Sequence, residues 1–283
     1  MIASLQKVSS GAVPTEAADK EAALRHWMRQ MGKVLVAYSG GVDSAYLSLI
    51  AAQELGDNSW SVIGISPSVS QHQRNEAKQI AADLGLNFFE IDTHEINSGG
   101  YRANAGDRCY FCKSELYAVL RQAAAERNFE IIADGTNADD LSDHRPGRVA
   151  ADENDVQSPL ALLGFTKEEI RVLSRRHGLK GWDRPSAPCL SSRIAVGVPV
   201  TIERLSKVEK GEEMLRAEGF REFRVRVHGE LVRIEIAREE LVANFDFDLA
   251  ERVSQKFRKL GFKFVTLDLE GFRSGSTNGM AKK

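Results

Sequence analysis

Short apolar runs alternate with amphipathic segments through the first half of the chain. The runs are rich in β-branched and aromatic residues, as is typical of strands buried on both faces, and they lie at 34–38, 60–66, 87–92 and 130–133. Between and around them, apolar positions recur with the period of a helix, at 15–31, 42–55, 70–84 and 114–127. Strands that alternate with helices predict an α/β fold with a doubly wound parallel sheet.

The last third of the chain has a different pattern. A charged helical segment at 200–218 precedes two strictly alternating segments, 222–228 and 231–237, which are joined by a hairpin turn at His228-Gly229-Glu230. A helix at 247–260 and a strand at 263–269 complete an α-β-β-α-β order. This order predicts a second, smaller α+β domain.

These patterns predict the division of the chain and its loops. We expect a loose tail at 1–14, a first domain at 15–185, a second domain at 189–276 and a C-terminal tail at 277–283. Residues 93–108 and the stretch that begins at Asp143 are polar and predict loops. Thr166 and Glu169 form the pattern of a capping box that opens a helix ending at His177.

Composition narrows the class of protein. The 283 residues are 42% hydrophobic and 28% charged, as in ordinary globular proteins, and no apolar run is long enough to span a membrane. The 38 basic and 40 acidic residues leave a net charge of −2, which gives no general attraction to nucleic acid. We therefore expect a cytoplasmic protein without a membrane partner, and the charge counts against nucleic acid except at a local basic patch. We also expect a homo-oligomer and a small-molecule nucleotide substrate.

The segment Ser39-Gly40-Gly41-Val42-Asp43-Ser44 directly follows the first predicted strand. Two adjacent glycines allow a tight turn and leave N–H groups open at the positive end of the next helix, where they can hold a phosphate chain. The hydroxyls of Ser39 and Ser44 add donors. A carboxylate repels bare phosphate, so Asp43 is best explained by Mg²⁺ held beside a pyrophosphate. The alternative is a glycine-rich turn without a ligand.

Two further polar segments follow predicted strands. Ser66 comes after the second strand, and Gly135-Thr136 comes after the fourth. Ligands of parallel sheets bind at the carboxyl ends of the strands. We therefore expect Ser66, Gly135 and Thr136 to join the glycine-rich segment in one nucleotide-binding crevice.

Three cysteines are too few for a disulfide framework, and two of them form the pair Cys109-x-x-Cys112 at the start of a helix. Helical N–H groups lower the pKa of such thiols. A zinc site would need a fourth ligand, and none of the six histidines has ligand spacing. A 4Fe–4S cluster could be held by three thiolates, Cys109, Cys112 and Cys189, with one iron left open. The alternative is two buried structural cysteines and an unrelated third.

Two arginine-containing segments in the second half predict anion binding. Cys189 is followed by Leu-Ser-Ser192-Arg193, where hydroxyls and a guanidinium could favour a thiolate or bind an anion. Arg224 and Arg226 alternate along one strand, so both side chains leave the same face and could clamp a phosphate. The alternatives are a linker cysteine and a solvated sheet face with cross-strand ion pairs to Arg233 and Glu235.

The segment at 39–44 resembles the loop of the PP-loop ATP pyrophosphatases, which have the adenine nucleotide alpha hydrolase-like fold. The similarity extends over nearly the whole chain. With the segments 134–137, 143–147, 188–193, 224–228 and 267–275 in the same order, the chain resembles the ATP-dependent sulfur transferases of nickel-pincer nucleotide synthesis. The resemblance implies that ATP and Mg²⁺ adenylate a carboxylate of a pyridinium mononucleotide, that pyrophosphate leaves, and that sulfur replaces AMP to give a thiocarboxylate.

The resemblance also implies roles for individual residues. Asp43 and the three cysteines would be catalytic, and Ser192, Arg193, Arg224 and Arg226 would hold the substrate. In one branch of that family a single cysteine, at the position of Cys189, gives up its own sulfur. Because this chain also has Cys109 and Cys112, it resembles the branch in which an open iron of a 4Fe–4S cluster could carry the sulfide.

Three other classes share parts of this pattern. A tRNA thiolase combines the same loop with a similar cysteine triad, but the net charge of −2 counts against an RNA substrate. An amide-forming synthetase of the NAD- or GMP-synthetase kind would leave the cysteines without a role. A non-enzymatic nucleotide sensor would release no pyrophosphate.

Overall fold

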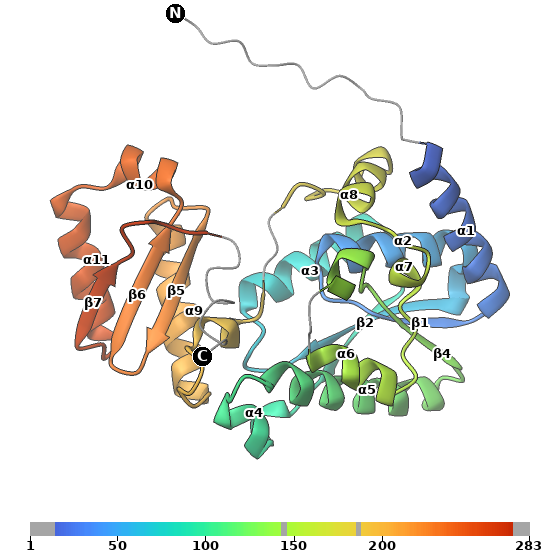
Figure 1. The fold of residues 1–283 in the computed structure, drawn as a ribbon, viewed down its shortest axis with the longest axis horizontal. Coiled ribbons are helices and arrows are strands. Elements are labelled where there is room, and N and C mark those ends of the chain that lie inside the picture. The colour runs from blue at the N-terminus through green and yellow to red at the C-terminus, as the bar shows by residue number, and fades with distance from the viewer. Residues whose placement is uncertain (1–14, 143–145, 185–187, 274–283) are drawn as a thin grey trace, which may run out of the picture.

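A computed structural model describes residues 15–142, 146–184 and 188–273. The two predicted tails lie outside these ranges, as do the predicted motif residues Asp143, Arg145, Ser274 and Gly275. Figure 1 shows two groups of strands, one within the larger part of the molecule and one in the smaller C-terminal part. No helix in the described ranges is long and apolar enough to cross a membrane.

The larger part is built on a four-stranded sheet, and all of its neighbouring strands are parallel. The order is β3-β2-β1-β4, with β1 at Val34–Ala37, β2 at Ser59–Ile65, β3 at Phe88–Asp92 and β4 at Ile131–Asp134. Each of the four predicted strands is present within two residues of its expected bounds. The parallel α/β prediction is therefore confirmed, and the carboxyl ends of the strands meet at one edge.

Helices cover both faces of this sheet (Figure 1). Along β1, Val34 and Val36 pack against one group of helices, whereas Leu35 and Ala37 pack into a cluster on the other face. Burial on both faces is why β1 is a continuous apolar run. The long helices are α1 at Thr15–Met31, α2 at Val42–Leu55, α3 at Gln71–Asp83, α5 at Arg108–Glu126 and α8 at Lys167–Arg176.

Two helices begin directly after a capping residue. The Thr166 side chain accepts a hydrogen bond from the N–H of Glu169, whose carboxylate in turn accepts from the N–H of Thr166, so the predicted capping box of α8 is confirmed. A second box, Ser70 with Gln73, opens α3. Helix α5 begins six residues before the predicted start, so the CxxC pair lies in its first turns.

Two loop predictions were wrong in part. Residues 93–108 contain a 3₁₀ turn at Glu95–Asn97 and the short helix α4 at Gly99–Ala103, which Ser98 caps. The stretch after Asp143 contains α6 at Pro146–Glu153. The buried residues of α6 are Ala150 and Ala151, which are too small to give a strong apolar signal. The short helix α7 at Pro159–Leu162 and the 3₁₀ turns at Gly56–Asn58 and Ala138–Ser142 complete this part. A further 3₁₀ turn, Leu190–Arg193, follows Cys189, and its Leu190 belongs to the core of the C-terminal part.

The C-terminal part has a three-stranded sheet in the order β5-β6-β7. The elements are α9 at Ile202–Ala217, β5 at Phe223–His228, β6 at Leu231–Ile236, α10 at Arg238–Asn244, α11 at Phe247–Lys259 and β7 at Phe264–Leu267. Strands β5 and β6 form the predicted antiparallel hairpin, with Gly229 at φ +69°, and β7 pairs parallel to β6. The predicted order is confirmed, with α10 as an additional helix.

The two parts share a packed junction. Tyr101 of α4 belongs to the apolar core of the C-terminal part, and Phe111 and Cys112 of α5 pack against that core. The Asn104 side chain donates to the carbonyl oxygens of Ala195, at 2.8 Å, and of Val198, at 3.0 Å. The segment that contains Cys189 is thus held against α4 and α5, and the division into two domains near residue 185 remains a prediction.

Candidate functional site

A pocket of about 480 Å³ lies at the carboxyl ends of β1 and β2. It brings together residues from the glycine-rich loop and the three cysteines, which are up to 150 positions apart in the chain. Of the residues predicted for nucleotide binding and catalysis, those that line it are Ser39, Gly40, Gly41, Asp43, Ser66, Cys109, Cys112 and Cys189. The expected meeting of loop and cysteines in one crevice is therefore present in the structure.

The loop between β1 and α2 is shaped by its glycines. Gly40 has φ +77°, and a Cβ placed on it would lie 2.8 Å from the Cβ of Ala77 on α3, so both conformation and space require glycine. Gly41 is the N-cap of α2 and has no side chain to cap the first N–H groups. These N–H groups stay available for an anion at the positive end of a 14-residue helix.

Asp43 lies in the first turn of α2 with an unusual environment for a carboxylate. Its Oδ1 is buried and finds no hydrogen-bond partner among the described residues, while its Oδ2 accepts from Asn137 Nδ2 at 3.3 Å and lies 4.0 Å from Lys167 Nζ. Burial raises the pKa of Asp43, and the nearby Asp140 carboxylate adds to the rise. An unsatisfied oxygen beside a second carboxylate fits a divalent cation, which is the role predicted for Asp43.

Gly135, Thr136 and Ser44 support the loop without lining the pocket. A Cβ on Gly135 would lie 2.8 Å from the backbone nitrogen of Ser44, so this glycine lets β4 approach the start of α2. The Thr136 hydroxyl donates to Asp134 Oδ2 at 2.9 Å. The Ser44 hydroxyl lies 3.1 Å from Ser39 Oγ and donates to the carbonyl of Gly41 at 3.1 Å. Direct nucleotide contacts from these three residues remain predictions.

The three cysteines are free thiols that line the same pocket. Cys109 is exposed, and Cys112 and Cys189 are partly buried. Burial raises the pKa of the Cys112 thiol, and the neighbouring Cys189 and Glu95 add to the rise. The lowered pKa that was expected from the helical N–H groups is therefore contradicted at Cys112: its thiol stays protonated, and iron would have to displace the proton to bind a thiolate. Within the described ranges, no three Cys, His, Asp or Glu side chains are gathered as a metal site, so the cluster remains a prediction.

Glu95 is a pocket residue that the sequence prediction missed. It is 2% exposed, and its carboxylate accepts hydrogen bonds from three hydroxyls, those of Ser66, Ser68 (2.9 Å) and Thr93 (3.0 Å). The carbonyl of Ser68 in turn accepts from the N–H of Leu190 at 2.8 Å, so Glu95 fixes the segment beside Cys189. A polar residue just past the third strand was the available signal. The pocket residues Arg108, Lys113, Asp140 and Lys167 were also missed.

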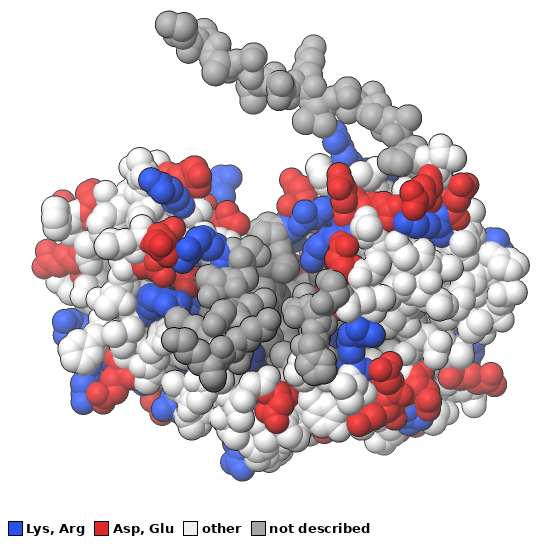
Figure 2. All heavy atoms as spheres, in the orientation of Figure 1, with Lys and Arg blue, Asp and Glu red and all other residues white. Residues whose placement is uncertain are grey.

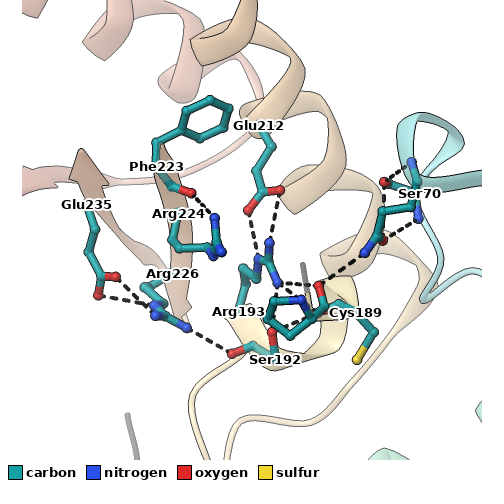
Figure 3. Close-up of polar contacts among 11 residues, drawn as sticks. Ser70, Cys189, Ser192, Arg193, Glu212, Phe223, Arg224, Arg226 and Glu235 are labelled. Atoms are coloured by element: carbon teal, nitrogen blue, oxygen red, sulfur yellow. Dashed lines mark hydrogen bonds and ion pairs between the residues drawn. The ribbon is translucent and has the colours of Figure 1, made fainter. Parts of the chain in front are cut away.

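Arg193 is a buried link in the cysteine segment (Figure 3). It is 4% exposed, and its Nε donates to Glu212 Oε1 at 2.8 Å while its Nη1 donates to the carbonyls of Pro188 and Cys189. The Ser192 hydroxyl also donates to the Cys189 carbonyl, at 2.8 Å. The guanidinium therefore holds the Cys189 backbone, and Figure 3 shows the sulfur pointing away from it. Neither Ser192 nor Arg193 lines the pocket, and their contact with substrate remains a prediction.

Arg224 and Arg226 do leave the same face of β5, as the register with β6 requires. Arg226 is 7% exposed and binds the buried carboxylate of Glu235 through two nitrogens, at 3.1 and 3.0 Å. This is the cross-strand ion pair considered as the alternative, although it is buried rather than solvated. Arg224 lies over the ring of Phe272, and burial together with the nearby Arg193 lowers its pKa to about 10. A phosphate clamp there remains a prediction.

The face shown in Figure 2 carries basic and acidic side chains side by side. Positive charges do not merge into one surface on the described part of this face. On the described part of this face, the mixture of both signs agrees with the net charge of −2.

Some known proteins are similar to part of the chain. The sequence pattern of the NAD synthase family matches residues 18–125, which include the loop and the first three strands. The chain is 28% identical to the glutamine-hydrolysing GMP synthase of Thermus thermophilus over 69% of its own length and 42% of that protein.

Two relatives match over almost the whole chain. An uncharacterised protein of Synechocystis sp. is 41% identical over 92% of this chain and 97% of its own length. The pyridinium-3,5-bisthiocarboxylic acid mononucleotide synthase of Lactiplantibacillus plantarum is 32% identical over 94% of this chain and 96% of its own length. With the loop, the cysteine segment and both sheets inside the matched region, the chain belongs to the family of the pyridinium-3,5-bisthiocarboxylic acid mononucleotide synthases.

Proposed function

We propose that this protein is an ATP-dependent sulfur transferase of nickel-pincer nucleotide synthesis. It adenylates a carboxylate of a pyridinium mononucleotide, releases pyrophosphate, and replaces AMP by sulfur to give a thiocarboxylate. The observation that carries the proposal is that the Ser39–Asp43 loop and the three cysteines line one and the same pocket. An acyl-adenylate made at the loop would lie within the same pocket as the sulfur chemistry.

The loop supplies the groups that adenylation requires. The open N–H groups at the start of α2 would hold the β- and γ-phosphates, which leave as pyrophosphate. Asp43 would hold Mg²⁺ through its unpartnered Oδ1, and Mg²⁺ would neutralise charge on the leaving group. Lys167, which lines the pocket 4.0 Å from Asp43, adds a positive charge on the same side.

The cysteine site would supply the sulfur. Cys109, Cys112 and Cys189 would hold a 4Fe–4S cluster, which could deliver a sulfide from an open iron. Glu95 and Arg193 would keep the Cys189 segment in place, through Ser68 and through the carbonyls of residues 188 and 189. The nucleotide substrate would place its own phosphate toward Ser192, Arg193, Arg224 and Arg226. We also propose a cytoplasmic homo-oligomer.

A first experiment identifies the sulfur source. Protein purified without oxygen would be analysed for iron and acid-labile sulfide and then allowed one turnover with ATP, Mg²⁺ and the pyridinium dicarboxylate mononucleotide. We expect each of Cys109→Ser, Cys112→Ser and Cys189→Ser to lose iron and multiple-turnover activity together. Cys109 is exposed, and Cys112 and Cys189 are only partly buried, so serine should leave the fold intact at each position.

Intact-protein mass spectrometry after that turnover separates the two routes. The cluster route leaves the mass of the polypeptide unchanged. If iron-free protein forms the thiocarboxylate and loses the mass of one sulfur at Cys189, the cysteine itself is the donor and the cluster assignment is wrong. An amide product would instead favour a synthetase of the kind named by the GMP synthase relatives.

A further inference from the structure

Arg108 is a pocket residue that the proposed reaction has not yet used. It is the first residue of α5, directly before Cys109, and it is half-buried. Its Nη1 donates to Asn104 Oδ1 at 2.8 Å and to the carbonyl oxygen of Ser191 at 2.7 Å. These two bonds use both protons of Nη1, so one edge of the planar guanidinium is fixed by the protein.

The two residues that accept from Nη1 are themselves buried and held in place. Asn104, at the C-terminal end of α4, is 1% exposed, and its Nδ2 donates to the carbonyls of Ala195 and Val198. Ser191 is 1% exposed and lies in the 3₁₀ turn at Leu190–Arg193. The guanidinium is therefore positioned before any ligand arrives, which lowers the conformational entropy lost on binding.

The opposite edge of this guanidinium is open. Within the described ranges, Nε and Nη2 of Arg108 make no hydrogen bond, and no carboxylate lies within ion-pair distance of the side chain. The N–H bonds of Nε and Nη2 run parallel along one edge, and their spacing matches the two oxygens of a carboxylate. An unpaired guanidinium with this edge free is suited to bind a planar anion through two hydrogen bonds.

The other cations that line the pocket already have neighbours that engage their charge. Lys180 and Arg184 pair with carboxylates of α3, each at 2.9 Å. Lys167 lies 4.0 Å from a carboxylate oxygen in the first turn of α2, and Lys113 lies over the ring of a tyrosine one turn further along α5. Among the described residues that line the pocket, Arg108 is the guanidinium whose charge has no carboxylate partner.

The proposed substrate contains a group that needs such a partner. Its pyridinium ring carries two carboxylates, and only one of them is adenylated in a turnover. The other keeps its negative charge and would be costly to bury without a cation. Arg108 adjoins Cys109 and holds the carbonyl two residues after Cys189, so the guanidinium lies beside the segment where the proposed sulfur transfer takes place.

We propose that Arg108 binds the carboxylate that is not being adenylated, through Nε and Nη2, and thereby selects a pyridinium dicarboxylate over a monocarboxylate. The inference rests on the proposed function, because it names the group that orients the substrate of that reaction. No bond is made or broken at Arg108. The contact fixes the ring so that the other carboxylate faces the adenylating loop.

The test compares two substrates in two proteins. Pyrophosphate release is measured with the dicarboxylate mononucleotide and with nicotinic acid mononucleotide, which carries one carboxylate, for the wild type and for Arg108→Met. We expect kcat/KM of the wild type to be roughly ten- to a hundredfold higher for the dicarboxylate, the usual effect of a charge-assisted contact. In Arg108→Met this preference should fall to about twofold or less, because the group that binds the second carboxylate is gone.

The ratio between the two substrates separates binding from a structural role. Loss of the Nη1 bonds to Asn104 and Ser191 affects both substrates alike, so it cancels in the ratio. Arg108→Lys keeps the charge and loses the parallel N–H pair, so it should retain part of the preference. Arg102→Met is the matched control: Arg102 is exposed on α4 and does not line the pocket, so both kcat/KM values should stay at the wild-type level.

Two results would overturn the inference while leaving the proposed function in place. One is an equal fall in kcat/KM for both substrates in Arg108→Met, which would make Arg108 a structural support of the cysteine segment. The other is a wild-type protein that releases pyrophosphate equally well with either substrate. If the wild type releases no pyrophosphate with the dicarboxylate, the proposed function itself fails, and the role of Arg108 fails with it.

Discussion

The loop at 39–44 and the arginines of the C-terminal part were both predicted to bind an anion. In the structure, polar groups of the loop lack partners, whereas two of the arginines are bound to buried carboxylates. At the loop, the first N–H groups of α2 lack a side-chain cap and Asp43 Oδ1 has no described partner. At the C-terminal sheet, Arg193 binds Glu212 and Arg226 binds Glu235, with all four side chains largely buried. Unmet polar groups indicate where a ligand completes the structure, whereas a satisfied buried pair primarily serves the fold.

The largest effect is expected at Asp43, whose Oδ1 has no partner among the described residues. Asp43→Asn removes the charge that would hold Mg²⁺, so pyrophosphate release should fall by roughly a thousandfold, the scale of several kcal/mol of charge stabilisation. The fold should be unaffected, because the lost carboxylate oxygen has no described partner. Pyrophosphate is measured in a coupled assay, with Asp83→Asn, in a surface pair with Lys180, as the control. Wild-type release by Asp43→Asn would refute the adenylation proposal.

Arg226 tests the other half of the comparison, an arginine whose hydrogen bonds are already made to a buried carboxylate. Arg226→Ala removes two of the hydrogen bonds to Glu235, which is 1% exposed and keeps Arg233 at 2.9 Å as its remaining partner, and should cost about 1.5–3 kcal/mol in the free energy of unfolding. Urea denaturation measures this loss, and Arg252→Ala, in a surface pair with Glu218, should cost little.

The double variant Arg226→Met, Glu235→Leu separates folding from binding. Replacing both charges by apolar side chains should restore part of the stability, because Arg233 loses Glu235 but keeps its ion pair with Asp268. If Arg226 also holds the substrate phosphate, the dissociation constant of the substrate should still rise by roughly ten- to a hundredfold, with ATP affinity unchanged. An unchanged constant would leave Arg226 with a structural role alone.

A smaller effect is expected at Glu95, whose carboxylate lines the pocket but already accepts hydrogen bonds from protein hydroxyls. Glu95→Gln disturbs the three hydroxyl hydrogen bonds that its carboxylate accepts, and should lower the free energy of unfolding by about 1–3 kcal/mol. Because Ser68 holds Leu190, sulfur transfer should fall more than pyrophosphate release. Glu90→Gln, which removes part of a partly exposed pair with Arg74, is the control. Equal losses in both half-reactions would contradict a specific role beside Cys189.

The smallest effect concerns His228, at the end of β5. Burial lowers the pKa of His228, and the charges of Arg233 and Arg226 lower it further. The unfolded chain therefore binds a proton more readily, so stability is full above pH 6.5 and falls as the pH drops through the folded-state pKa. His228→Gln should flatten this acid-side decline in urea denaturation. An identical slope in both proteins would show that other groups cause it.

The sequence predicts the parts of the structure that rest on local pattern. Buried strands, the capping box of α8 and the loop at 39–44 depend on adjacent residues, and each is present. Helix α6 escaped prediction because alanines form its buried face. Glu95 escaped because its role comes from hydroxyls on two different strand ends, which meet only after folding.

The hydrogen-bond partners of the arginines could not be predicted from the sequence. Alternation correctly placed Arg224 and Arg226 on one face, but their partners depend on strand register and on α9, which brings Glu212 to Arg193. The spacing of the cysteines predicted the CxxC turn, whereas the approach of Cys189 depends on the packing of α4 and α5 against the C-terminal core.

The central claim is that one pocket activates a carboxylate with ATP and then exchanges AMP for sulfur. The most direct measurement is mass spectrometry of the nucleotide product formed without oxygen from ATP, Mg²⁺ and the pyridinium dicarboxylate mononucleotide, with AMP and pyrophosphate counted in the same reaction. We predict a product in which sulfur replaces one carboxylate oxygen, with one AMP and one pyrophosphate for each thiocarboxylate. An amide product, or formation of ADP and phosphate in place of AMP and pyrophosphate, would contradict the account.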